Sequence, residues 1–284
     1  MKTKKINLRN KKYMKHILVI PIVLFVLSIT ACATSPTGRS QLMLVSPEQA
    51  ISASKEAYIQ TLKPLDDEGK IDNDPAVTKR VKLITGRLIS QAIEQYPRTR
   101  DWDWSVKVID DPEVVNAWCM AGGKMAIYTG LLNKVKPSDD ELAQVMGHEI
   151  SHALANHTAE KMSVQMASQM GMAAVAAVVS DTDYGGAALS GTALAATMAI
   201  SLPNSRTAER ESDRMGIELA AKAGYNPNAA ASLWEKMAKV GGDTPPEFFS
   251  THPSPGNRQS TLRSLVPKMM PYYQQKKMRP VYPL

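Results

Sequence analysis

Two histidines and a glutamate in residues 146–154 have the types and spacing that a metal site requires. His148, Glu149 and His152 form His-Glu-x-x-His inside an apolar helical pattern. Because an α-helix turns by about 100° per residue, a spacing of four puts both imidazoles on one face. Two neutral imidazoles can hold a zinc ion, and the carboxylate can take a proton from a water on that ion. The motif therefore predicts zinc-dependent hydrolysis.

Two histidines leave zinc short of ligands, so a third must come from elsewhere. His157 lies nine residues after His148. This is about 180° round the helix, so His157 is expected at the helix C-terminus and not on the ion. Glu209 and Asp213 share one face of a later helix, and one can bind zinc while the other orients an imidazole. Glu211 points about 200° away from Glu209. A solvated charged helix is the alternative for this stretch.

The helix that carries the first motif has a clear start and a buried face. Ser138 suits the N-cap, and Glu141, three residues later, completes a capping box. The apolar positions are Leu142, Val145, Met146, Ile150 and Leu154. A catalytic metal needs a rigid, core-anchored element, so we expect this helix at the centre of the fold.

The remaining periodic segments predict an α+β domain that is predominantly helical, with a small mixed or antiparallel sheet. Further helices are expected at residues 47–62, 75–96, 206–224, 227–240 and 259–268. Strands are expected at residues 104–108, 114–120 and 124–128. Gly122 and Gly123 suit a turn with positive φ between the last two strands, and residues 241–250 are expected to be a loop.

The second expected strand is a candidate for binding an extended peptide. It includes Asn116, Ala117, Trp118, Cys119 and Met120. At a sheet edge its free backbone groups can pair with a substrate, whereas a covered hairpin would be purely structural. Both readings stay open. Cys119 has no base near it in the sequence, so we expect a buried small hydrophobe and not a nucleophile.

The positive charge of the chain is concentrated at its start. The 284 residues carry a net charge of +7, and seven of the 34 basic residues precede residue 32, with no acidic residue among them. The other 27 basic residues balance the 27 acidic ones. The body is therefore neutral, which argues against a nucleic-acid partner.

Residues 1–31 read as a signal peptide. An apolar run at residues 17–29 follows the basic segment and is too short for a comfortable membrane span. The sequence that ends at Cys32 resembles the lipobox of bacterial lipoproteins, which implies cleavage before Cys32 and its lipidation; an uncleaved anchor is the alternative. Met14 is a second candidate start. Ala33, in place of Asp, implies the outer membrane, facing the periplasm. With Cys32 lipidated, no intramolecular disulfide remains.

The mature chain is expected to be one domain with a tether, an insertion and a tail. Residues 32–46 read as the lipid tether, 47–270 as the domain and 271–284 as the tail. Residues 160–202 contain two apolar runs, each shorter than the ~20 residues of a span. They predict a helical hairpin that packs on the domain or dips into the lipid surface, with methionines that fill gaps and do not bind metal.

The joint pattern of His148–His152, Glu209, Asp213 and Gly216 resembles the gluzincin peptidases. Within them it is similar to the group of HtpX, Oma, BepA and LoiP (peptidase family M-forty-eight), over about residues 75–265. Further matches are Asn116-Ala117, Gly122-Gly123-Lys124, Tyr128-Thr129-Gly130-Leu131, His252-Pro253 and Arg258. The 56-residue gap from His152 to Glu209 argues against a thermolysin-like enzyme. Ser212 replaces the usual Ala, and the helical-repeat tail of BepA is missing.

The resemblance implies a zincin-like fold and one Zn²⁺ on His148, His152 and Glu209. Glu149 would then act as the general base, and Asp213 would fix an imidazole, that of His148 being favoured. His252 is a candidate to stabilise the oxyanion or to cap the open position of zinc at rest. A structural His-Pro turn is the equal alternative for His252.

The resemblance also implies peptide-bond hydrolysis in misfolded or stalled envelope proteins, including outer-membrane proteins. A lipid-anchored chaperone or assembly factor with a blocked or structural zinc site is the alternative. The three-ligand set favours an enzyme, because structural zinc has four protein ligands. A peptidoglycan amidase is weaker, because nothing predicts a glycan-binding module. The sequence leaves the oligomeric state open.

Overall fold

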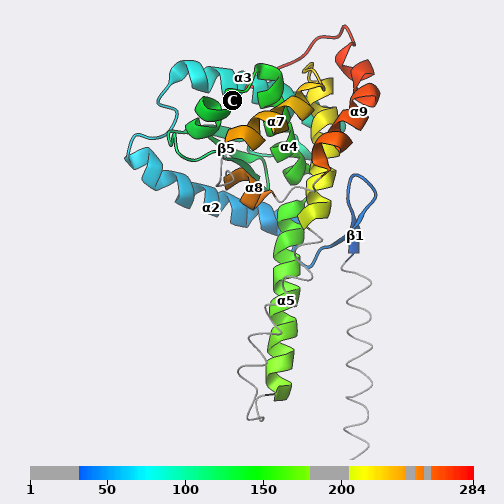
Figure 1. Cartoon of the computed structure of the whole chain (residues 1–284). Helices are drawn as coiled ribbons and strands as arrows, with labels where there is room; N and C mark the ends of the chain where they lie inside the picture. Colours follow the sequence, from blue (N-terminus) through cyan, green and yellow to red (C-terminus); the bar gives the residue numbers. More distant parts are fainter. Residues whose placement is uncertain (1–31, 180–204, 241–246, 253–256) are drawn as a thin grey trace, which may run out of the picture.

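The computed structural model describes residues 32–179, 205–240, 247–252 and 257–284. A helical body surrounds a small sheet, and one long helix extends out of this body (Figure 1). The sheet contains β3 (Ser105–Ile109), β5 (Lys124–Tyr128) and β4 (Ala117–Met120), in the order β3-β5-β4. β3 is parallel to β5 and β4 is antiparallel to it, so the sheet is mixed, as predicted.

Helices form most of the described chain, which confirms the predicted class, α+β and predominantly helical. They are α2 (Pro47–Asp67), α3 (Pro75–Gln95), α4 (Asp139–Leu154), α5 (His157–Val179), a helix at residues 205–222, α7 (Ala229–Val240), α8 (Glu247–Thr251) and α9 (Arg258–Tyr273). The described residues also contain a 3₁₀ helix, η1 (Pro97–Thr99), and a short π-helix, η2 (Leu131–Val135).

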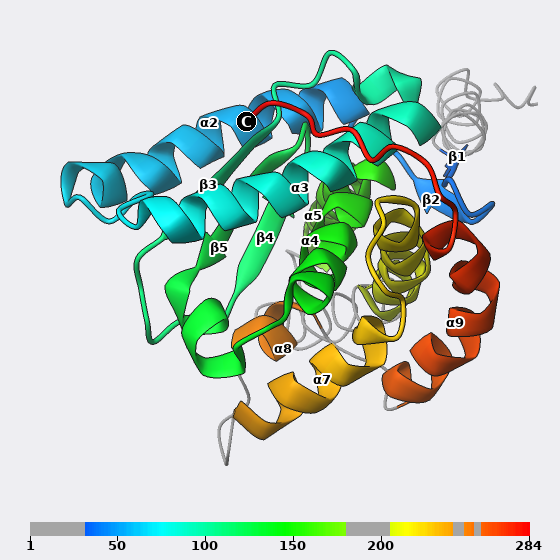
Figure 2. The same ribbon diagram turned by 90° about the horizontal axis from the view of Figure 1, so that it is seen from above.

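The central helix α4 starts as its sequence predicts. The Ser138 hydroxyl accepts from the Glu141 backbone N–H, and the Glu141 carboxylate accepts from the Ser138 N–H, which is a complete capping box. Its apolar residues Leu142, Met146 and Ile150 are fully buried, and each such burial contributes about 1.5–3 kcal/mol. Figure 2 shows α4 between the sheet and the helices of the C-terminal half. The metal motif therefore lies on a rigid core element.

Two glycines let helix 205–222 approach α4 closely at the motif. A Cβ atom on Gly216 would lie 2.8 Å from the backbone nitrogen of His148 and 2.9 Å from its Cα. A Cβ on Gly147 would lie 3.0 Å from the carbonyl oxygen of Gly216. Only glycine fits at position 216, because backbone atoms cannot move aside as a side chain can. This contact brings the acidic face of helix 205–222 to the imidazoles.

The N-terminal part of the described chain differs from the expected tether. β1 (Cys32–Thr34) and β2 (Ser40–Leu42) form an antiparallel hairpin. Gly38, with φ +90°, makes its turn. The hairpin is held to the body by Arg39, which forms ion pairs with Glu160 and Glu211. Residues 1–31, the expected signal peptide, lie outside the described residues.

The prediction that His157 ends the motif helix is wrong. α4 ends at Leu154, Asn156 adopts the left-handed conformation with φ 56°, and His157 is the first residue of α5. Asparagine tolerates this conformation better than most residues. The chain therefore turns where helical spacing assumed that it continued.

Three smaller boundaries also differ from the predictions. The strand expected at residues 114–120 begins only at Ala117, whose backbone N–H donates to the side chain of Asn116. The expected loop at 241–250 contains the start of α8. α9 continues to Tyr273, past the predicted end at 268 and through two prolines.

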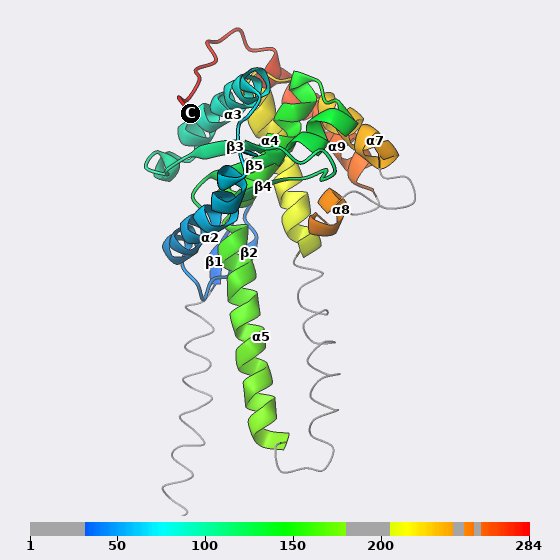
Figure 3. The same cartoon turned by 90° about the vertical axis from the view of Figure 1, so that its left-hand side faces the viewer.

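The expected hairpin at residues 160–202 is described only in its first part. α5 runs away from the body as a single helix (Figure 3), and its Met166 and Met170 are exposed. The second apolar run lies outside the described residues. Among the helices of the described ranges, none combines the length and apolar character that crossing a membrane requires.

Candidate active site

Four potential metal donors converge where α4, helix 205–222 and the end of α8 meet. They are His148, His152, Glu209 and His252, and one donor atom from each lies within 4.8 Å of all the others. The two Nε2 atoms of His148 and His152 are 3.1 Å apart. Glu209 places its carboxylate oxygens 3.2 Å from Nε2 of His148 and 3.4 Å from that of His152. The distant carboxylate thus reaches the imidazole pair.

The arrangement fits a zinc ion. Two imidazoles that present Nε2 and one carboxylate are donors that zinc prefers in catalytic sites. Glu209 Oε2 and Glu149 Oε1 are buried, and within the described part of the chain neither has a hydrogen-bond donor. Buried polar atoms normally have a partner. A cation at this point would supply one for Glu209.

The electrostatics of the zinc-free cluster separate the two imidazoles. Burial would lower the pKa of His148, but Asp213 and Glu209 raise it to about 9. Burial lowers the pKa of His152 well below its usual value, so this ring is neutral. Burial would raise the pKa of Glu209, but the neighbouring imidazoles of His148 and His252 hold it far below its usual value. A deprotonated carboxylate and a neutral imidazole are the forms that bind a metal.

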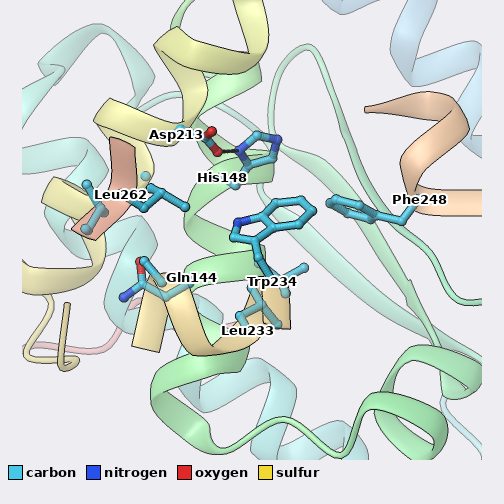
Figure 4. Close-up of a pocket in the computed structure, with 11 residues that line it drawn as sticks. Gln144, His148, Asp213, Leu233, Trp234, Phe248 and Leu262 are labelled. Carbon is cyan, nitrogen blue, oxygen red and sulfur yellow. Dashed lines mark ion pairs between the residues drawn. The ribbon is translucent and has the colours of Figure 1, made fainter. Parts of the chain in front are cut away.

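His148 is held from behind by a carboxylate and an arginine. Asp213 Oδ1 lies 3.0 Å from Nδ1 of His148 (Figure 4). The Arg258 guanidinium donates to the same oxygen at 3.0 Å and 2.5 Å and lies over the Trp234 ring, 3.5 Å from its centroid. Asp213 thus lies beside the imidazole that the family resemblance favoured. The sequence predicts no role for Arg258, which is only one of the residues that match the family.

His152 has a different support, which helical spacing did not reveal. Nδ1 of His157 lies 2.9 Å from Nδ1 of His152, and Nε2 of His157 lies 3.1 Å from Glu211 Oε2. Glu211 is not among the donors of the cluster, and its carboxylate contacts His157. The signal that would have identified these residues is Asn156, whose type permits the turn before α5.

Glu149 lies beside the metal donors and is buried. Its Oε1 is 3.4 Å from Nε2 of His252. Burial raises its pKa, and the charge of Glu209 adds to this, whereas His252 and His148 lower it. A carboxylate with a raised pKa in a buried site is suited to accept a proton.

His252 is a fourth donor in the cluster. Its Nδ1 lies 3.4 Å from Nε2 of His148 and 3.3 Å from Glu209 Oε1. The ring stacks on Phe248 of α8 with a centroid distance of 4.3 Å, and Phe248 packs against Trp234. Pro253 lies outside the described residues. The ring therefore lies among the other potential donors of the cluster.

β4 has one strand neighbour, β5, among the strands described, and its other side lies along α4 (Figure 2). Asn116, just before β4, is buried and donates to Glu247 at 3.2 Å. Cys119 is a free, buried thiol, as expected. Burial raises the pKa of Cys119 well above its usual value, and the charge of Glu149 adds to this.

Comparison with known proteins agrees with this geometry. The model of Peptidase family M48 matches residues 75–266. The chain is 31% identical over 258 residues to the mitochondrial metalloendopeptidase OMA1 of Bos taurus, which covers 88% of this chain and 49% of that protein. It is 40% identical over 163 residues to OMA1 of Arabidopsis thaliana, with coverage of 56% and 30%. It is 29% identical over 206 residues to the beta-barrel assembly-enhancing protease of Escherichia coli strain K12, with coverage of 70% and 41%.

The chain thus spans half or less of the length of these curated relatives. The family match nevertheless includes α4, helix 205–222 and His252, so it contains every donor of the cluster. Family and donor set agree on zinc as the metal of this site. The chain belongs to peptidase family M48.

Proposed function

We propose that the chain is a zinc metalloendopeptidase anchored by lipid to the bacterial envelope. One observation carries the catalytic part: Glu149 is buried beside a cluster of His148, His152 and Glu209 that is built for one divalent ion. Family membership supports the same activity. The lipid anchor rests on Cys32 and the segment before it.

The chemistry divides between the ion and the side chains. Zinc, when held by His148, His152 and Glu209, lowers the pKa of water and polarises a carbonyl. Glu149 accepts the proton of the attacking water and passes it to the leaving amine. Its raised pKa brings the carboxyl closer to the pH at which it must exchange that proton. Asp213 holds His148 so that Nε2 faces the ion.

His252 is proposed to cap the fourth position of the metal at rest. Its Nδ1 is among the donors, and its Nε2 faces Glu149. Replacing His252 with Ala distinguishes capping from oxyanion stabilisation. Faster cleavage of a small peptide indicates a cap. A loss of kcat with unchanged zinc content indicates oxyanion stabilisation.

We place the substrate along β4, from Asn116 to Met120, because β4 lies at a sheet edge beside α4. An extended peptide there implies unfolded protein as the substrate, and the envelope location implies misfolded or stalled envelope proteins. The name of the Escherichia coli relative, a beta-barrel assembly-enhancing protease, is consistent with this substrate class. Replacing Cys32 with Ser should abolish labelling by a radioactive fatty acid; labelling that persists would remove the anchor from the proposal.

Digestion of casein by the purified protein tests the activity directly. Cleavage should stop on addition of a chelator and return with zinc. The Glu149→Gln variant should keep one zinc per chain, since Glu149 is not among the donors, and lose at least about 10²-fold in rate. Retained proteolysis in this variant would refute the assignment of the base.

One observation favours the alternative, a chaperone or assembly factor with a blocked zinc site. With His252 the cluster supplies four protein donors, which is the number that closed structural sites use. Suppression of aggregation of an unfolded outer-membrane protein separates the two functions. If wild type and Glu149→Gln both suppress aggregation and neither cleaves, even with His252→Ala, the alternative holds.

A further inference from the structure

We infer that the β1–β2 hairpin is a structural part of the metal centre, in which Arg39 positions the zinc ligand His152 through Glu211 and His157. These are positioning residues, because none of the three is among the donors of the cluster. The inference rests on the ligand set proposed above. It assigns a role in metal binding to a segment that the sequence presented as a tether.

The innermost link joins two imidazoles. If Nε2 of His152 faces the ion, the neutral ring carries its proton on Nδ1. That N–H donates to Nδ1 of His157, 2.9 Å away. His157 then carries its own proton on Nε2, which lies 3.1 Å from Glu211 Oε2. Each ring therefore has one tautomer that satisfies the whole chain of hydrogen bonds. This fixes the orientation of His152.

The second link fixes Glu211. Its Oε2 accepts from Nε of Arg39 at 3.0 Å, and its Oε1 accepts from the Thr37 hydroxyl at 2.5 Å. Both donors come from the hairpin. Together with Nε2 of His157, which lies 3.1 Å from Oε2, they surround the Glu211 carboxylate with three hydrogen-bond donors.

The outer link ties the hairpin to the start of α5. Nη1 and Nη2 of Arg39 donate to the two oxygens of Glu160, both at 2.6 Å. Gln41 donates to the carbonyl oxygen of Ala155 at 2.8 Å and to Glu160 at 2.9 Å. The hairpin therefore holds the turn between α4 and α5, directly before His157 at the start of α5. The two carboxylates on either side of Arg39 are buried.

The charges explain why a cation is needed at this point. Without Arg39, Glu160 and Glu211 would be two buried carboxylates that share no cation. Removing one partner of a buried ion pair costs far more than an exposed pair contributes. Glu211 would then move toward solvent, and His157 would lose its acceptor. His152 would keep its place on α4 but lose the group that fixes its ring.

The test is zinc retention in the full mature chain with Arg39→Met, which keeps the stem and removes the guanidinium. Competition with a chromogenic chelator should show zinc affinity about 10-fold below wild type. Arg80→Met is the matched control, because Arg80 also pairs with a carboxylate, Asp139, and with the carbonyl oxygen of Pro137, away from the metal donors. Arg39→Lys should recover part of the loss, because one ammonium can pair with one of the two carboxylates.

Unfolding is separated from loss of positioning by Glu211→Gln, which keeps size and shape but removes the charge that orders the relay. Circular dichroism of the zinc-free variants checks the fold. Zinc affinity within twofold of wild type in folded Arg39→Met and Glu211→Gln would overturn the inference. The readout does not depend on proteolysis. If wild type fails to cleave casein but Arg39→Met loses zinc, the proposed function fails and this inference stands.

Discussion

The two imidazoles proposed to face zinc are held in two different ways. His148 has a carboxylate directly behind it, Asp213, which a buried arginine braces. His152 reaches its carboxylate, Glu211, only through a second imidazole, that of His157. Both supports end in an arginine, Arg258 for the first ring and Arg39 for the second.

The difference lies in how far along the chain each support must reach. Asp213 is one helical turn from Glu209, so the direct support and the third ligand come from the same short stretch. The relay joins residues from α5, helix 205–222 and the N-terminal hairpin, and Arg39 is 172 residues from Glu211. The orientation of His148 depends on one direct contact, whereas that of His152 depends on several hydrogen bonds in series. We therefore expect the direct support to be the more sensitive to substitution.

The largest effect is expected from Asp213→Asn. The amide cannot offer a charge to His148 or to Arg258, which is left buried and without its closest partner. Zinc affinity should fall about 10-fold to 100-fold, and the free energy of unfolding should fall by about 3–5 kcal/mol. Chelator competition and urea unfolding of the zinc-free protein measure the two losses. A zinc affinity equal to that of wild type would show that Asp213 does not support zinc binding by His148.

A smaller loss is expected from His157→Phe, which keeps the ring shape and removes both nitrogens. His152 then has a buried N–H without its acceptor, but it remains on the rigid helix α4. Zinc affinity should fall about 10-fold, the low end for residues that hold a ligand. Adding Arg39→Met to His157→Phe should lower it no further, because residues in one network are not additive. If the fold-losses of zinc affinity of the two single variants multiply in the double variant, Arg39 acts independently of His157.

The smallest effect is a difference in pH dependence of the zinc-free protein. The pKa of His148 in the folded state, about 9, lies above the reference value of 6.5. Its stabilisation is therefore complete below pH 6.5 and is lost as the pH rises through 9. His152, whose pKa is lowered, adds nothing of this kind. The melting temperature of wild type should fall by a few degrees across this window, at roughly 2–4 °C per kcal/mol.

Asp213→Asn is the reference for that measurement, because it removes the carboxylate that raises the His148 pKa. Its melting temperature should change less than that of wild type between pH 6.5 and 9. His157→Phe should keep the wild-type slope. If the melting temperatures of wild type and Asp213→Asn change equally with pH, a group other than His148 causes the pH dependence.

Local spacing grouped the residues of the direct support, but only the family resemblance separated the roles of Glu209 and Asp213. The four-residue intervals between His148 and His152, and between Glu209 and Asp213, each describe one face of one helix. The capping box of Ser138 and Glu141 likewise depends on three residues of sequence. Helix and strand positions followed from periodicity for the same reason.

The relay could not be predicted in this way. Its first step depends on a turn at Asn156 where the helical pattern was assumed to continue. Its last step depends on Arg39, whose ion pairs join residues 121 and 172 positions apart. Nothing in the local sequence of the hairpin distinguishes it from a polar linker. The fit of Gly216 against the His148 backbone is equally a property of two helices packed together.

The position of His157 at the root of α5 has a mechanical consequence. α5 is one continuous helix of 23 residues, about 34 Å long, and its outer part projects away from the body (Figure 3). Because a helix of this length is stiff, a movement of its outer half is transmitted to its first turn. That turn carries the ring against which His152 rests. A shift of the outer part of α5 relative to the body would therefore move the His157 ring that contacts His152.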